Sequence, residues 1–228
     1  MGLLVLHGTG WLGGAVLAVF FSSSNLISRV LPPRPPISLD PKSDRRDQWQ
    51  VGANGGAAAI GAAIGLFDTH LGLWLVTCTL AAAAADTWAT TTGGWSRVPP
   101  RLFWSGRVVP PGSSGGMTAA GTAGAAAGAL LVAGTGAIAG GLPMLLPVGT
   151  LIGFFGMVAD SALGALLQGR FRCTSCNLLS EWRVHRCGAA TTLESGMTWL
   201  NNDGVNFLAT AFAAGAGLVS WYWLSPSS

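Results

Sequence analysis

Long apolar segments constrain this chain more than any other feature of its sequence. Six of them can be recognised, at residues 11–30, 52–67, 71–91, 116–138, 144–168 and 205–224. A helix needs about 20 apolar residues to cross the hydrocarbon core of a bilayer, and the second segment is short of that length. Charged residues make up only 9% of the chain, although a soluble domain carries about 25%. The sequence therefore predicts an all-α, polytopic membrane bundle of about six transmembrane helices, forming a single domain over residues 1–228.

Glycine is the second unusual feature, with 34 residues in the chain. Inside a helix in water, each glycine costs about 1 kcal/mol relative to alanine. Within a membrane, however, small residues let neighbouring helices approach closely and pack. The glycine content thus predicts helices in tight mutual contact.

The basic residues follow a one-sided pattern. The loop after the first segment contains Arg29, Arg34, Lys42, Arg45 and Arg46, the loop after the third contains Arg97, Arg101 and Arg107, and the loop after the fifth contains Arg170, Arg172, Arg183 and Arg186. These are all 12 Lys and Arg residues, and six spans place the three loops on one side. The positive-inside rule makes this side the cytoplasm or its organellar equivalent, with both termini outside. We expect an integral, multi-pass membrane protein; the sequence identifies no organelle, with a plastid or an endomembrane as the choices in a eukaryote.

Polar side chains gather in stripes toward the basic side of the predicted spans. The stripes contain three candidate catalytic carboxylates, Asp86, Asp160 and Asp203, and four candidate substrate-binding residues, Asp47, Asn54, Asn202 and Asn206. In the fifth span the stripe is Gly153, Gly156, Asp160, Gly164 and Gln168. Ionisable residues inside a membrane are costly and functional by default, and Mg²⁺ typically binds one or two carboxylates together with substrate phosphates. The pattern predicts a cation–phosphate site; hydrogen bonds between helices and simple exposure near the interface are the alternatives.

A basic, glycine-rich loop precedes the fourth span. Its candidate substrate-binding residues are Arg101, Arg107, Gly112, Ser113, Gly115 and Gly116. Arginine can bind phosphate through two hydrogen bonds, and the turn GSSGG at 112–116 is expected to open the fourth helix, where free N–H groups bind anions. The alternative is an ordinary turn in which Ser113 or Ser114 caps the helix.

The polar loop at 170–203 contains four residues of the types that bind metals, namely Cys173, Cys176, His185 and Cys187. A Cys-x2-Cys pair followed by His and Cys suits tetrahedral Zn²⁺. On a reducing side of the membrane a disulfide is disfavoured. Structural zinc is therefore the expectation, with a redox dithiol or unligated thiols as alternatives. Cys78, within the third span, is expected to be a small packing residue.

Five motifs give the chain a family resemblance. They are RRDQWQVGANGG (45–56), ADTWATTTG (85–93), PPRLFWSGRVVPPGSSGGMT (99–118), ADSALGALLQ (159–168) and LNNDGVNFL (200–208). In these motifs the chain resembles the transmembrane protein 19 family of integral membrane proteins. The resemblance implies relationship to a plant phytyl-phosphate kinase, which transfers a phosphoryl group from a nucleoside triphosphate to an isoprenoid monophosphate. The chain departs from the family at Thr91, where Glu is usual, and the resemblance also leads us to expect a further hydrophobic span upstream of residue 11, which we do not recognise in this sequence.

Together these features favour a membrane-embedded phosphotransferase acting on an isoprenoid or other lipid monophosphate with a nucleoside triphosphate and Mg²⁺. Such chemistry depends mainly on positioning and charge neutralisation. The partners are then the lipid bilayer, the isoprenoid phosphate and the nucleotide, and no nucleic acid. A transporter of lipid phosphate or a small anion is the second hypothesis. A non-catalytic membrane protein is the third, and Thr91 favours it if the family Glu is essential.

Overall fold

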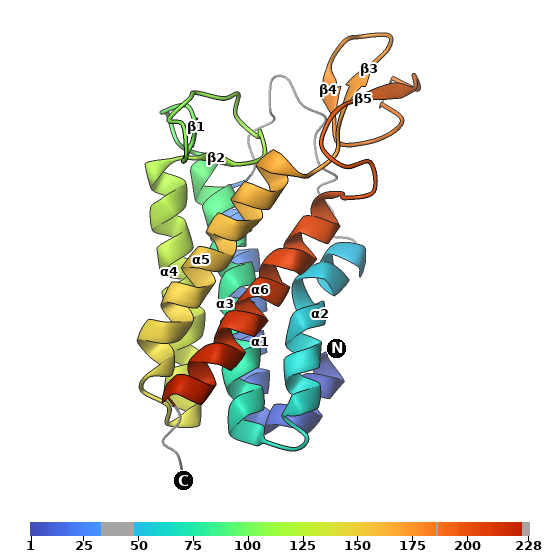
Figure 1. The fold of residues 1–228 in the computed structure, drawn as a ribbon. Coiled ribbons are helices and arrows are strands. Elements are labelled where there is room, and N and C mark those ends of the chain that lie inside the picture. Colours follow the sequence, from blue (N-terminus) through green and yellow to red (C-terminus); the bar gives the residue numbers. More distant parts are fainter. Residues whose placement is uncertain (33–47, 186, 225–228) are drawn as a thin grey trace.

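The computed structural model describes residues 1–32, 48–185 and 187–224, with no side chains described at 48–51 and 54. It contains six α-helices in this part of the chain: α1 (Gly2–Val30), α2 (Gln48–Ile64), α3 (Thr69–Gly93), α4 (Ala119–Gly140), α5 (Leu145–Leu166) and α6 (Asn202–Leu224) (Figure 1). Five of them are long and apolar enough to cross a membrane, and α2 is the shorter exception. The predicted membrane bundle is therefore confirmed, including the short second span.

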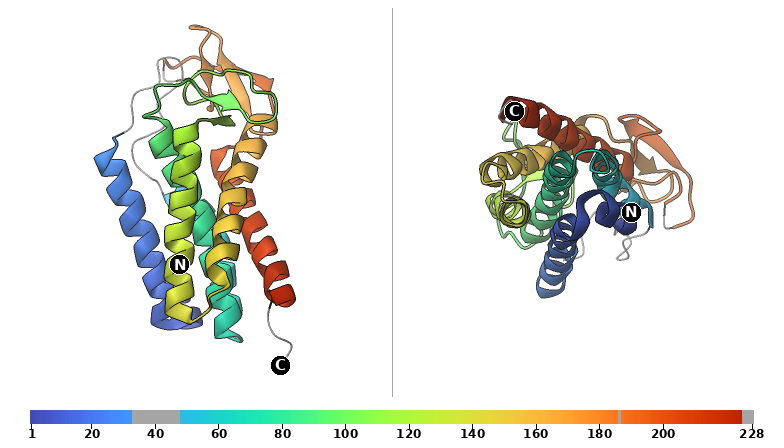
Figure 2. Two further views of the ribbon diagram at one scale, coloured as in Figure 1. Left: turned by 90° about the vertical axis from the view of Figure 1, so that its left-hand side faces the viewer. Right: turned by 90° about the horizontal axis from the view of Figure 1, so that it is seen from below.

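Helix α3 is the centre of the bundle. It contacts all five other helices, and the view along the bundle axis shows it surrounded by them (Figure 2). Every residue from Leu71 to Ala85 is buried, as expected of a helix that is apolar all round. The five consecutive alanines at 81–85 keep this helix thin, so that its neighbours can come close.

Glycines on the surrounding helices face α3. A Cβ atom added to Gly153 of α5 would lie 2.9 Å from Cβ of Ala81, and one added to Gly128 of α4 would lie 2.9 Å from the carbonyl oxygen of Ala84. A Cβ on Gly217 of α6 would lie 3.3 Å from the Cβ of Cys78, which is a buried packing residue as predicted. The close packing inferred from the glycine content is confirmed at these contacts.

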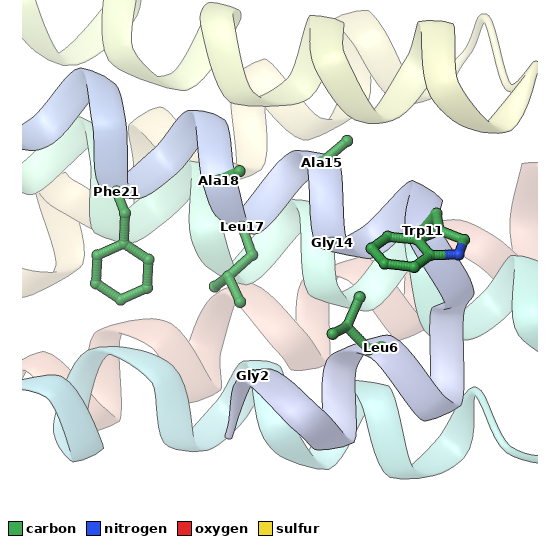
Figure 3. A pocket seen from close by; sticks show the side chains of 8 residues that line it. All are labelled: Gly2, Leu6, Trp11, Gly14, Ala15, Leu17, Ala18 and Phe21. Carbon is green, nitrogen blue, oxygen red and sulfur yellow. The ribbon is translucent and has the colours of Figure 1, made fainter.

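Helix α1 is broken at Gly10, whose φ of 63° and ψ of −158° are non-helical. The segment at 2–9 folds back beside the segment at 11–30, as Figure 3 shows. An apolar groove of about 500 Å³ lies between them, lined by Gly2, Leu6, Trp11, Gly14, Ala15, Leu17, Ala18 and Phe21. The prediction placed the residues before 11 outside the membrane. Instead Met1 contacts Gly55 of α2, part-way along the bundle (Figure 1).

The loops after α3 and α5 form small antiparallel sheets at one end of the bundle (Figure 1). Strands β1 (Arg101–Leu102) and β2 (Gly116–Met117) pair in the first loop. Strands β3 (Arg170–Cys173), β4 (Leu179–Ser180) and β5 (Thr191–Ser195) form a sheet of order β4-β3-β5 in the second. The sequence predicted polar loops, without these strands. The basic residues that the structure describes, Arg29, Arg97, Arg101, Arg107, Arg170, Arg172 and Arg183, lie at this same end, as the charge pattern predicted.

Candidate functional site

The candidate site begins at a layer where three helices touch. A Cβ atom added to Gly156 of α5 would lie 2.6 Å from Cβ of Ala82 in α3 and 3.8 Å from the carbonyl oxygen of Ala209 in α6. A real carbon–carbon contact is about 3.5–4.0 Å, so only glycine allows this approach. Gly156 therefore fixes the relative heights of α3, α5 and α6.

The predicted carboxylates follow one helical turn closer to the basic end. Asp86 stands four residues after Ala82, Asp160 four after Gly156, and Asn206 three before Ala209 in the oppositely directed α6. Residues three or four apart lie on the same helix face. The three side chains thus belong to one layer of the bundle, one turn beyond the contact of Gly156 with Ala82.

The burial of these residues is graded. Asn206 is buried at 8% exposure, whereas Asp86 and Asp160 are half-buried. Asn202 and Asp203 are half-buried in the first turn of α6, where a helix favours negative charge. Asp86, Asp160, Asn202 and Asp203 all have interaction partners in the structure. The layer is accordingly polar and only partly buried.

The stripe on α5 leads from this layer to the glycine-rich loop. A Cβ on Gly164 would lie 3.4 Å from Cβ of Ser114, and the hydroxyl of Ser114 donates to Oε1 of Gln168 at 3.5 Å. Gln168 is only 3% exposed, and its Nε2 has no hydrogen-bond partner among the described residues. Gln168 lies eight residues beyond Asp160, just past the end of α5 at Leu166. The glycine-rich turn therefore lies at the end of the helix that carries Asp160.

Arg170 forms a hydrogen bond with the glycine-rich turn. Its Nη2 donates to the carbonyl oxygen of Ser114 at 3.1 Å. Arg101 and Arg107 are exposed, and Nη1 of Arg101 donates to the carbonyl oxygen of Gly106 within its own hairpin. From the sequence, Arg170 contributed only to the predicted topology, and Gln168 was not among the predicted binding residues. The helical spacing of Gln168 from Asp160 and Gly164 could have identified Gln168 from the sequence. The proximity of Arg170 to Ser114 is visible only in the folded structure.

The expectation that GSSGG opens the fourth helix is wrong. Helix α4 begins at Ala119, and its cap is Thr118, whose hydroxyl accepts from the backbone N–H of Gly121 at 3.0 Å. The turn instead closes on itself, since the N–H of Gly116 donates to the carbonyl oxygen of Ser113 at 3.1 Å. Positive φ angles at Gly112 (84°) and Gly115 (79°) shape this turn, and Gly116 enters β2. Neither Ser113 nor Ser114 caps the helix, and the turn does not present the end of the helix dipole.

Some predicted residues can be placed only in part. Asp47 lies outside the described residues, and Asn54 lies within α2 without a described side chain. Thr91, the departure from the family pattern, donates its hydroxyl to the carbonyl oxygen of Thr87 at 2.8 Å. It lies in the last turns of α3, on the basic side of Asp86.

The metal-type residues form a second, separate cluster in the sheet of β3 to β5. The Sγ atoms of Cys173 and Cys187 are 3.5 Å apart, those of Cys176 and Cys187 are 3.8 Å apart, and Nδ1 of His185 lies 3.3 Å from Sγ of Cys176. All four donor atoms lie within 4.8 Å of one another. The backbone N–H of Cys176 is the main cause that lowers the pKa of the Cys173 thiol to about 6, which favours the thiolate that metals bind. The predicted grouping of these four residues is confirmed.

Comparison with known proteins agrees with this membrane architecture. A family model described as "Integral membrane protein DUF92" matches residues 1–214. The chain belongs to the DUF92 family. The family resemblance found in the motifs is thereby confirmed, and an integral, multi-pass membrane location with it.

Two relatives show how widely the DUF92 family is distributed. Protein PGR of Arabidopsis thaliana is 30% identical over 240 residues, which cover 91% of this chain and 81% of PGR. The uncharacterized membrane protein MJ0933 of Methanocaldococcus jannaschii is 31% identical over 169 residues, covering 74% of this chain and 70% of that protein. No solved structure matches the chain.

Proposed function

We propose that the protein is a phosphotransferase that moves the terminal phosphoryl group of a nucleoside triphosphate to an isoprenoid or similar lipid monophosphate. The observation that carries the proposal is that α5 carries Asp160, in the layer of Asp86 and Asn206, and ends beside a second polar group formed by Gln168, Ser114 and Arg170. Carboxylates for a metal and donors for phosphates are thus combined at the basic end of a membrane bundle. The reaction itself is the one implied by the resemblance to the transmembrane protein 19 family.

The residues divide into two groups by charge. Asp86, Asp160 and Asp203 are the ligands that would hold Mg²⁺, which neutralises charge on the phosphates when bound. Donors for phosphate oxygens would be the guanidinium of Arg170, the turn at 112–116 and Nε2 of Gln168, which has no hydrogen-bond partner among the described residues. A bond forms between the γ-phosphorus and an oxygen of the lipid monophosphate, while the bond to the β-phosphate oxygen breaks and nucleoside diphosphate leaves.

The bilayer contributes the positioning of the lipid. The apolar tail stays among the acyl chains, and its phosphate then lies in the interface, at the height of the basic loops. Exposed Phe103 and Trp104 beside Arg101 suit such an interface, where aromatic rings gather. The groove beside α1 lacks polar lining and has no part in this scheme.

Two other functions use the same residues differently. A carrier of lipid phosphate or of a small anion would bind the substrate at the polar layer and move it without turnover. A non-catalytic membrane protein is favoured if the carboxylate missing at Thr91 is required for catalysis. Purified protein with radiolabelled nucleotide, Mg²⁺ and a prenyl monophosphate separates the three: turnover, uptake into vesicles without turnover, or neither.

Asp160→Asn tests the proposed site. The substitution keeps the shape and most hydrogen bonds of the side chain but removes the charge that a metal needs, so turnover should fall about 100-fold, equivalent to about 2.7 kcal/mol. The fold should be retained, because asparagine has nearly the same shape and can keep most of the hydrogen bonds of the half-buried side chain. Thermal unfolding and turnover are measured on the same preparation.

Asp68→Asn is the matched control. Asp68 caps α3 at the opposite end of the bundle, where its carboxylate accepts from the backbone N–H of Leu71 at 3.0 Å. Asparagine caps helices about as well as aspartate, so both stability and turnover should be unchanged. An Asp160→Asn protein that is stable and fully active would refute the metal role of Asp160.

A further inference from the structure

The chain between α5 and α6 folds without a substantial hydrophobic core. Among its described residues from 168 to 201, the buried apolar side chains are Phe171, Cys173 and Leu200. Large side chains such as Trp182 and Val184 are instead exposed at 57% and 62%. Small units of this size normally need disulfides or a metal in place of a core. Something other than apolar burial must therefore hold this sheet together.

A disulfide does not fill this role. All cysteines are free in the structure, and the closest pair of Sγ atoms, in Cys173 and Cys187, is 3.5 Å apart. A disulfide bond is about 2.05 Å long. The thiols are close enough to share a ligand but are not bonded to one another.

The spacing of the donors matches the edges of a tetrahedron around zinc. With Zn–S of about 2.3 Å and Zn–N of about 2.0–2.1 Å, tetrahedral angles give edges of about 3.8 Å between sulfurs and about 3.6 Å between sulfur and nitrogen. The observed sulfur separations are 3.5 and 3.8 Å, and Nδ1 of His185 lies 3.0 and 3.3 Å from the sulfurs of Cys187 and Cys176. These four of the six edges agree to within about 0.6 Å, and all four ligand atoms lie within 4.8 Å of one another.

The four metal-binding side chains come from two tight turns that face each other. In the first, the N–H of Cys173 donates to the carbonyl oxygen of Leu178 and the N–H of Asn177 donates back to Cys173; Asn177 has a positive φ of 58°. In the second, the N–H of His185 donates to Ala189, and Gly188 has a φ of 83°. Each turn contributes two metal-binding side chains. A tetrahedral metal ion can join two such turns by binding two ligands from each.

We propose that Cys173, Cys176, His185 and Cys187 bind one structural Zn²⁺ that joins these two turns and so holds the ends of α5 and α6 in place. The sheet is attached to both helices at its base. The N–H of Gly169 donates to the carbonyl oxygen of Leu200 at 2.9 Å, and the N–H of Met197 donates to that of Leu167 at 2.9 Å. Gly169 follows α5 and Leu200 precedes α6. A metal ion that joins the two turns would therefore also stabilise the place where the chain leaves α5 and enters α6. The inference does not depend on phosphotransfer.

Metal analysis of purified protein tests the proposal. The protein should contain one zinc ion per chain, and so should the control Cys78→Ala, which removes a thiol that is buried in α3. The double variant Cys173→Ser/Cys176→Ser should contain none. Zinc absent from the parent and not taken up from added Zn²⁺, zinc retained in the double variant, or a disulfide found among these cysteines would each overturn the proposal.

Two further measurements apply if the double variant does not fold. His185→Cys should keep its zinc, and the X-ray absorption of that zinc should change from three sulfurs and one nitrogen to four sulfurs. Chelation of zinc from the parent should raise amide hydrogen exchange in residues 168–201 severalfold while residues 71–85 in α3 stay protected. Unchanged ligation in His185→Cys, or unchanged exchange after the zinc is removed, contradicts the proposal.

Discussion

Replacement of Gly156 by alanine should separate the two helices that carry Asp86 and Asp160. The added Cβ would lie 2.6 Å from Cβ of Ala82, whereas carbon atoms in contact are about 3.5–4.0 Å apart. Ala82 has no flexible side chain that can move away, so α3 and α5 must separate locally by about 1 Å. Overpacking of this kind costs about 1–3 kcal/mol.

Gly215→Ala provides the matched control for this prediction. Gly215 lies within α6, is exposed, and has no atom within 4 Å of the position where its Cβ would stand. Both substitutions gain up to about 1 kcal/mol of helix propensity, so this contribution cancels when the two variants are compared. The difference between their free energies of unfolding is then the cost of the contact, about 1–3 kcal/mol.

Unfolding in mixed micelles, titrated with a denaturing detergent, measures this difference. Gly156→Ala should be less stable than Gly215→Ala, and its turnover should fall further than its stability explains, because the carboxylate layer lies one turn away. A Gly156→Ala protein as stable as the Gly215→Ala control would refute the packing argument. A destabilised protein with full turnover would preserve the packing but refute its link to the site.

Two further predictions concern the cap of α4 and the topology. Thr118→Ala should lower the free energy of unfolding by about 1 kcal/mol, because it removes the hydroxyl that accepts from Gly121, whereas Ser113→Ala should have little effect; equal losses in the two variants would contradict the assignment of the cap. In sealed vesicles, Ser105→Cys should react with a membrane-impermeant maleimide from one side and Thr69→Cys only from the other, since these positions lie at opposite ends of the bundle; labelling of both from the same side would be incompatible with the proposed orientation.

The helices of this fold could be predicted from the sequence because each depends on a local property. An apolar run of membrane length has few alternatives to a helix. The confinement of basic residues to three loops indicated that these loops lie on one side of the membrane. The polar stripe on α5 was likewise visible as a spacing. The residues that pack against this stripe could not be predicted, because the contact of Gly156 with Ala82 joins helices far apart in the sequence.

Three local features escaped prediction for identifiable reasons. The break at Gly10 lies within a continuous apolar stretch, and only its positive φ of 63° distinguishes it from the other glycines. The strands have only 2 to 5 residues each, too few to show a period of two. The start of α4 was placed too early because small apolar residues continue upstream of Thr118.

Gly156 and the carboxylates of Asp86 and Asp160 lie one helical turn apart in the bundle. A carboxylate within a membrane costs about 2.5–3.5 kcal/mol even on translocon scales, and two of them repel each other unless a cation or hydrogen-bond donors lie between them. Asp86 and Asp160 nevertheless stand one turn beyond Ala82 and Gly156, at the closest contact between α3 and α5. Close packing at that point limits how far apart the two carboxylates can move. If separation of the helices were harmless, the lowest free energy would be reached with the carboxylates apart and exposed. Their position one turn beyond the contact of Gly156 with Ala82 is the reason why Gly156→Ala and Asp160→Asn are expected to affect the same step.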